Sequence, residues 1–157
     1  MSQTSPSTRR INGANFRIGV AAARFNEALV DGLLVRLRAV LRTAGAKRIE
    51  IVRVPGSHEV PWAAGRLAAT GKFDCVVALG VLIGGDTNHH ELVGQSVSHA
   101  LQRVALDTGI PVINGVIVAG SRAQARARCT GRINRGSEFA CAALEMAALK
   151  IALKGKS

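Results

Sequence analysis

The 157-residue sequence is poor in aromatic residues, with no tyrosine, one tryptophan and four phenylalanines. Because proteins that bind single-stranded nucleic acid stack bases on aromatic side chains, this scarcity argues against a base-stacking surface. Acidic residues are also few: 10 Asp and Glu stand against 21 Lys and Arg, a formal net charge of +11. Such an excess indicates an anionic substrate, a nucleic acid or an acidic surface as partner. The basic residues are spread along the chain, which makes nucleic acid the least favoured of the three.

Cysteine is scarce as well, and Cys75, Cys129 and Cys141 are far apart, with no CxxC pair. An odd number of scattered cysteines predicts reduced structural thiols rather than a zinc site. No apolar run is long enough to span a membrane, and no signal-peptide pattern is present. We therefore expect a cytoplasmic protein without a metal. A single domain at residues 16–157 should follow a flexible, polar N-terminal arm at residues 1–15.

Four apolar runs of strand length alternate with stretches in which apolar residues recur at helical spacing. The strands are expected at residues 16–22, 48–54, 73–79 and 111–118. Asn26 and Ser121 are candidate helix caps. The alternation predicts an α/β three-layer sandwich, with a four-stranded, mainly parallel, flavodoxin-like sheet and helices on both faces.

The most informative stretch runs from Gly80 to His90, between the third apolar run and a helical pattern. A glycine-rich bend at a helix start leaves backbone N–H groups free, and the helix dipole favours negative charge there. Thr87 adds a hydroxyl donor, and His89 follows where an imidazole can exchange protons with a ligand. From the bend alone, an equal alternative is a helix cap formed by Asp86 or Thr87, with two surface histidines.

Ligands of parallel α/β sheets bind beyond the carboxyl ends of the strands. That rule brings four loops to one edge of the sheet. They are the loops with Phe25, with residues 57–59, with the central bend, and at the end of the fourth strand near Asn114. Because these loops hold most of the unusual residues of the chain, their convergence favours a ligand site over the capping alternative.

Four segments, in this order and at these spacings, resemble the lumazine synthase family: residues 24–26, 54–61, 78–89 and 134–147. The resemblance covers about residues 16–150. It implies a transferase of riboflavin biosynthesis that works without a cofactor. The family condenses 5-amino-6-(D-ribitylamino)uracil with 3,4-dihydroxy-2-butanone 4-phosphate, which yields 6,7-dimethyl-8-ribityllumazine, phosphate and water. This is the penultimate step of the pathway.

The resemblance also implies roles for individual residues. His89 matches the proton-transfer histidine of the family, and Asp86 and Thr87 match its phosphate-binding pair, with Asp86 using its backbone N–H. Arg128 matches the phosphate-binding arginine, and a guanidinium suits a phosphate leaving group. The pyrimidine and ribityl groups are expected to contact Phe25, Ser57, His58, Glu59, Val81, Leu82, Ile83 and Asn114.

Some positions depart from the family pattern. Asn114 stands where a phenylalanine often contacts the pyrimidine, His58 replaces an aromatic or aliphatic residue, and Gly84 stands where a basic residue is frequent. His90 replaces an aromatic residue and is interpreted as a packing or stacking residue. These changes predict a more polar pocket. They leave open a weakly active or inactive paralogue that forms a shell or binds polyanions, and, less favoured, a generic sugar-phosphate enzyme.

The resemblance further implies a homo-oligomer built from pentamers, with active sites shared between neighbouring subunits. Arg128 and Arg135 are expected to reach the next subunit's pocket, and Glu138 falls at a supporting site carboxylate. The short loop at residues 130–135 lacks the insertion of pentamer-only fungal relatives, which favours an icosahedral shell of about 60 subunits. Riboflavin synthase is a candidate partner; membrane and nucleic acid are not expected to be.

Overall fold

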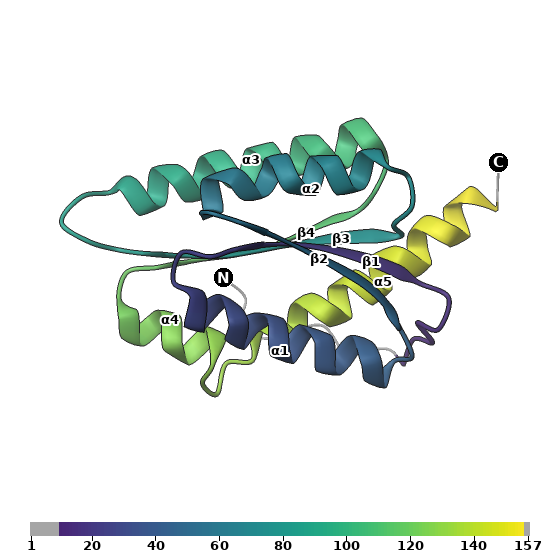
Figure 1. The fold of residues 1–157 in the computed structure, drawn as a ribbon, viewed down its shortest axis with the longest axis horizontal. Helices are drawn as coiled ribbons and strands as arrows, with labels where there is room; N and C mark the ends of the chain where they lie inside the picture. The colour runs from purple at the N-terminus through teal and green to yellow at the C-terminus, as the bar shows by residue number, and fades with distance from the viewer. Residues whose placement is uncertain (1–9, 156–157) are drawn as a thin grey trace.

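The computed structural model describes residues 10–155 (Figure 1). Its strands are β1 (Arg17–Ala23), β2 (Arg48–Val54), β3 (Cys75–Ile83) and β4 (Val112–Ala119). Its helices are α1 (Glu27–Thr43), the short 3-10 helix η1 (Ser57–Glu59), α2 (Val60–Ala69), α3 (His89–Thr108), α4 (Arg122–Cys129) and α5 (Arg135–Lys154). The N-terminal arm predicted for residues 1–15 lies largely outside the described residues.

All four strands are parallel, in the order β2-β1-β3-β4. Helices α2 and α3 cover one face of the sheet, and α1, α4 and α5 cover the other (Figure 1). This arrangement confirms the predicted three-layer α/β sandwich with helices on both faces. No helix within residues 10–155 is both long and apolar enough to cross a membrane.

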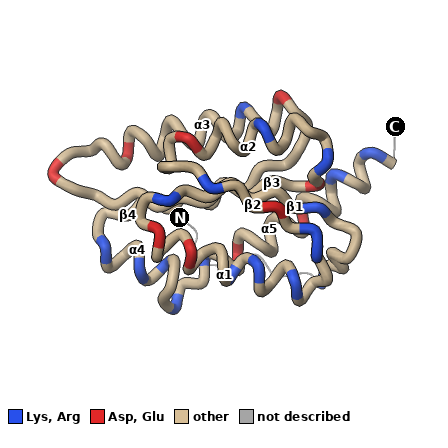
Figure 2. The backbone as a smooth tube through the Cα atoms, viewed as in Figure 1, with Lys and Arg blue, Asp and Glu red and all other residues tan. Residues whose placement is uncertain are grey.

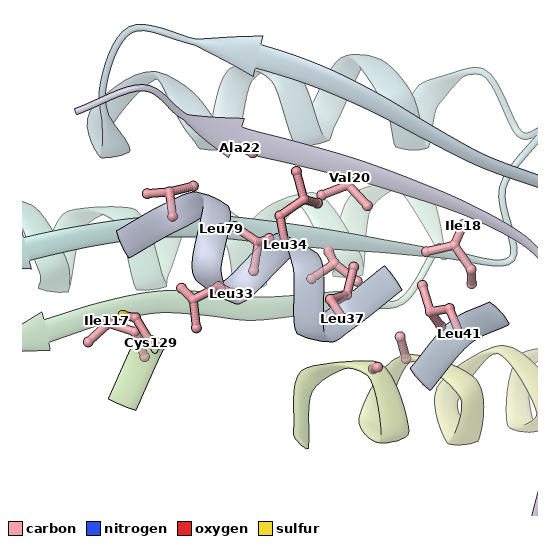
Figure 3. Packing of buried hydrophobic residues seen from close by; sticks show 14 of the residues in the cluster. Ile18, Val20, Ala22, Leu33, Leu34, Leu37, Leu41, Leu79, Ile117 and Cys129 are labelled. Carbon is pink, nitrogen blue, oxygen red and sulfur yellow. The ribbon is translucent and has the colours of Figure 1, made fainter. Parts of the chain in front are cut away.

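The sheet packs against one apolar cluster on each face. On the α1 face, Leu33, Leu37 and Leu41 recur at helical spacing and meet Ile18 and Val20 of β1 (Figure 3). All five side chains are fully buried. Burying a leucine or isoleucine stabilises the fold by about 1.5–3 kcal/mol, so this cluster holds α1 against β1.

Two details of the sequence prediction are wrong. The third strand was expected to end at residue 79, but β3 continues to Ile83 because residues 80–83 pair with residues 116–119 of β4. Helical spacing in the sequence also groups Leu92 with the apolar face of α3 and Ile151 with the buried stripe of α5, but Leu92 is 63% exposed and Ile151 is 46% exposed. No other part of residues 10–155 covers these two positions sufficiently to bury them.

The three cysteines are free, as predicted. Cys75 lies in β3 and is fully buried; this burial raises the pKa of its thiol to about 12. Burial likewise raises the pKa of Cys129 to about 11. Desolvation disfavours a thiolate, so both groups stay protonated and unreactive at neutral pH.

Helices α1 and α5 are in close contact at Gly136, in the first turn of α5. A Cβ atom at this position would collide with the carbonyl oxygen of Leu33 and lie 2.9 Å from Cβ of Arg36. Arg36 is also held in place by the loop between α4 and α5, because its guanidinium donates to the carbonyls of Thr130 and Gly131 at 2.7 and 2.8 Å. Glycine is therefore required where the two helices cross.

Replacing Gly136 with alanine should force the helices apart and lower the free energy of unfolding by about 1–3 kcal/mol, the usual cost of overpacking. Chemical or thermal denaturation measures the change. The matched control is Gly155→Ala at the end of α5, where the added Cβ would meet nothing closer than 3.9 Å. Equal stability of the two variants would contradict the packing argument.

Candidate active site

A pocket of about 420 Å³ lies beyond the carboxyl ends of β1 and β3, between η1 and the start of α3. This is the sheet edge at which the sequence placed a ligand site. The predicted residues that the structure brings together there are Phe25, Ser57, His58, Glu59, Val81, Leu82, Ile83, Thr87 and His89.

Phe25 lies at the mouth of the pocket and is 73% exposed. Its backbone is held in place, because its N–H donates to the carbonyl oxygen of Pro55 at 2.9 Å. Asn26 follows in the left-handed region, with a φ of 57°. Asn26 is the N-cap residue of α1, as predicted, and its backbone carbonyl accepts from the N–H groups of Leu29 and Val30. Its side chain does not cap the helix: Nδ2 donates to the carbonyl oxygen of Val81 at 2.8 Å and so ties the loop to β3.

Ser57 lines the pocket and is only 4% exposed. It packs so tightly on Gly80 that a Cβ at residue 80 would collide with the serine Oγ. Within residues 10–155 this Oγ makes no hydrogen bond. A buried hydroxyl without a partner is costly, and a bound polar ligand is one means of satisfying it.

The loop before α2 is closed by Glu59, whose Oε2 accepts a hydrogen bond from the Gly56 N–H at 2.8 Å. The other carboxylate oxygen, Oε1, lies 3.9 Å from Nδ1 of His58. Both side chains are exposed at the pocket. The loop thus offers a carboxylate and an imidazole to a ligand while its backbone stays fixed.

His89 is the first residue of α3, and its exposed side chain lines the pocket. The capping alternative for the preceding bend is wrong. The N-cap residue is Asn88, whose backbone carbonyl accepts from the N–H groups of Glu91 and Leu92, and no side chain caps the helix. The N–H groups of His89 and His90, which come before these bonds, are left for water or an anion.

Two predicted residues near this edge do not line the pocket. Asp86 lies outside it, although its neighbours Gly85 and Thr87 are both lining residues. Asn114 is exposed, but it lies near the start of β4, opposite Ala78, and not at the end of that strand. Its Oδ1 accepts from the N–H of Val116 at 3.1 Å.

The remaining three predicted residues, Arg128, Arg135 and Glu138, also lie outside the pocket of their own subunit. Arg128 is in α4, a helix with three basic residues, Arg122, Arg126 and Arg128, and no acidic one; Figure 2 shows basic residues of α4 on the α1 side of the sheet. Its Nη1 donates to the carbonyl oxygen of Gln124 at 3.1 Å. Arg135 and Glu138 form an ion pair with each other one turn apart in α5.

Five lining residues were not predicted as site residues: Asn26, Gly56, Gly85, His90 and Val93. Val93 lies one helical turn after His89, so the spacing of α3 already placed it on the same face. Asn26 and His90 could not be predicted in this way. Each directly follows a predicted site residue, Phe25 or His89, and adjacent side chains on a helix or loop are not expected to face the same way. Within residues 10–155, no group of three or more His, Cys, Asp or Glu side chains is arranged to hold a metal ion.

The pocket combines an imidazole, an exposed aromatic ring and a glycine-containing bend at a helix start. An aromatic face suits a flat ring, and a helix start suits an anion. An imidazole between them can move protons near neutral pH. The arrangement is suited to acid–base chemistry on a planar compound that reacts with an anionic partner.

Comparisons with known proteins agree with this chemistry. Residues 15–150 match the family model described as 6,7-dimethyl-8-ribityllumazine synthase. Proteins of that name from Thermococcus kodakarensis and Azoarcus sp. are 41% and 40% identical to this chain. The first alignment covers 92% of both chains and the second covers 88% of both. The chain therefore belongs to the 6,7-dimethyl-8-ribityllumazine synthase family.

Proposed function

We propose that this protein catalyses the condensation of 5-amino-6-(D-ribitylamino)uracil with 3,4-dihydroxy-2-butanone 4-phosphate. The products are 6,7-dimethyl-8-ribityllumazine, phosphate and water, and the reaction is the penultimate step of riboflavin biosynthesis. The observation that carries the proposal is the shared pocket of His89, Phe25 and Thr87 in a chain of this family.

The reaction consists of proton transfers and carbon–nitrogen bond formation, which side chains can support without a cofactor. The amine of the pyrimidine attacks the ketone and loses water to form an imine. Phosphate is then eliminated, and the second amine attacks the remaining carbonyl group and loses a second water, which closes the new ring. His89 is the acid–base group for these steps, because its exposed imidazole lines the pocket. Holding both substrates together lowers the entropic part of the barrier.

The pyrimidine occupies the part of the pocket formed by Phe25, η1 and the end of β3. The exposed ring of Phe25 stacks on the pyrimidine, which explains why an apolar side chain stands in water at the mouth. Ser57, His58 and Glu59 provide polar contacts to the pyrimidine and the ribityl chain. Residues 81–83 supply the apolar wall.

The phosphate binds at the start of α3, on the bend that contains Gly85 and Thr87. Asp86 contributes its backbone N–H while its carboxylate stays outside the pocket, since two negative groups repel each other. Arg128 neutralises the phosphate from a neighbouring subunit, with Arg135 and its partner Glu138 in support. The position of Arg128 outside the pocket of its own subunit leaves it available to a neighbouring pocket and supports this assignment.

The subunit is part of a cytoplasmic homo-oligomer built from pentamers, which assemble into an icosahedral shell, with riboflavin synthase as a candidate partner. Subunit contacts would bury apolar side chains that one subunit leaves exposed. Val35, Trp62, Leu92 and Leu106 are each more than 60% exposed. Exposed apolar surface of this extent is typical of interfaces. Free cysteines agree with a reducing compartment.

Replacing His89 with alanine should slow turnover by roughly a hundred- to ten-thousand-fold, the range for a lost general acid or base. The fold should be unaffected because the side chain is exposed. Turnover is followed by lumazine absorbance and by phosphate release. The matched control is His99→Ala, an exposed histidine on the same helix. An unchanged rate in His89→Ala would remove this residue from the mechanism.

Mixed assemblies test whether Arg128 serves a neighbouring subunit. Arg128→Ala and His89→Ala should each be slow when assembled alone. When both variants are co-expressed, about a quarter of the sites should combine an intact His89 pocket with an intact Arg128 from the next subunit. Activity should therefore return in the mixture. Absence of recovery in assemblies shown to contain both variants would place Arg128 within its own subunit or outside the site.

Sedimentation and electron microscopy test the assembly. A shell of about 60 subunits should sediment far faster than a pentamer and appear as a hollow closed particle. The measurement is made at the protein concentration used for the activity assay. A lone pentamer would contradict the shell and leave the shared site intact, whereas a monomer would contradict both.

A further inference from the structure

His90 lines the same pocket as His89, although the two residues are adjacent in α3. The side chain is half-buried at the start of the helix. Its Nε2 lies 3.1 Å from the point that a Cβ atom of Gly84 would occupy. Its Nδ1 is buried and makes no hydrogen bond within residues 10–155. A packing role alone explains none of these polar features.

Gly84 leaves the space that the His90 ring uses. A side chain at residue 84 would meet His90 Nε2 and would also lie 2.9 Å from the carbonyl oxygen of Gly120. The backbone cannot move away easily, because the Gly84 N–H donates to the carbonyl oxygen of Ala119 at 2.7 Å. The absence of a side chain at residue 84 therefore allows the imidazole to lie against the bend.

The surroundings of Nδ1 determine which nitrogen carries the proton. A buried N–H without an acceptor is rarer in proteins than an acceptor that lacks a donor. The proton of the neutral ring is therefore placed on Nε2, and Nδ1 keeps its lone pair. His90 thus presents an Nε2–H donor beside Gly84.

We propose that His90 is a specificity-determining residue, whose Nε2–H donates a hydrogen bond to the phosphate group of the second substrate. The inference rests on the proposed function, because that function places the phosphate on the bend. Among the groups of the two substrates, the phosphate is the one placed near Gly84, whereas the pyrimidine lies toward Phe25 and η1. His89 remains the acid–base group, and His90 selects the phosphate-bearing partner.

Two variants separate this donor from simple packing. His90→Phe keeps a ring of similar size and removes the donor. It should raise KM for the phosphate-bearing substrate by about tenfold to a hundredfold, the usual effect of losing a hydrogen bond to a charged group. The kcat and the KM for the pyrimidine substrate should change by less than about twofold. His90→Gln, whose amide also carries an N–H donor, should recover part of the loss, and His99→Phe is the exposed control.

Binding of inorganic phosphate provides a second measurement that needs no turnover. Titration followed by phosphorus NMR should show weaker binding to His90→Phe than to the wild-type assembly, in parallel with KM. The inference is overturned by equal phosphate affinity in the two proteins, by no phosphate binding to the wild type, or by a rise confined to the pyrimidine KM. Failure of the wild type to form lumazine would defeat the proposed function, while the phosphate titration would still test His90.

Discussion

The parallel pairing of β1 with β2 on one side and β3 on the other determines where the groups of the pocket lie. Ala23, the last residue of β1, stands opposite Val54, the last residue of β2. The two chains therefore leave the sheet at one level, and the N–H groups of Arg24 and Phe25 bond to the carbonyls of residues 54 and 55. β3 continues beyond that level, so its last residues form a side of the pocket.

Most of the fold was predictable because apolar periodicity is a local signal. Each of the four strands was placed to within a residue or two at its start, and Ser121 caps α4 as expected, accepting from the Gln124 N–H at 3.2 Å. The end of β3 was missed because it depends on pairing with β4, about 35 residues later in the chain. Exposure of Leu92 and Ile151 was missed for a related reason: periodicity identifies an apolar face but not what covers it.

The pocket was predictable where motif and strand order agree, as at Phe25, residues 57–59 and His89. It was not predictable where a contact spans distant parts of the chain. The Asn26–Val81 hydrogen bond joins residues 55 positions apart. The space at Gly84 that His90 uses is also bounded by Gly120, which lies in the loop after β4. The roles of Asn114, Arg128, Arg135 and Glu138 stay predictions, since these residues lie outside the pocket of their own subunit.

The left-handed backbone at Asn26 has a consequence for ligand affinity. A non-glycine residue in this conformation costs about 1–2 kcal/mol, and its hydrogen bond to Val81 offsets part of that cost during folding. The strand-exit loop is thereby held rigid before any substrate arrives. Immobilising a flexible loop would otherwise weaken association, so this preorganisation shifts an entropic penalty from each binding event to the single event of chain folding.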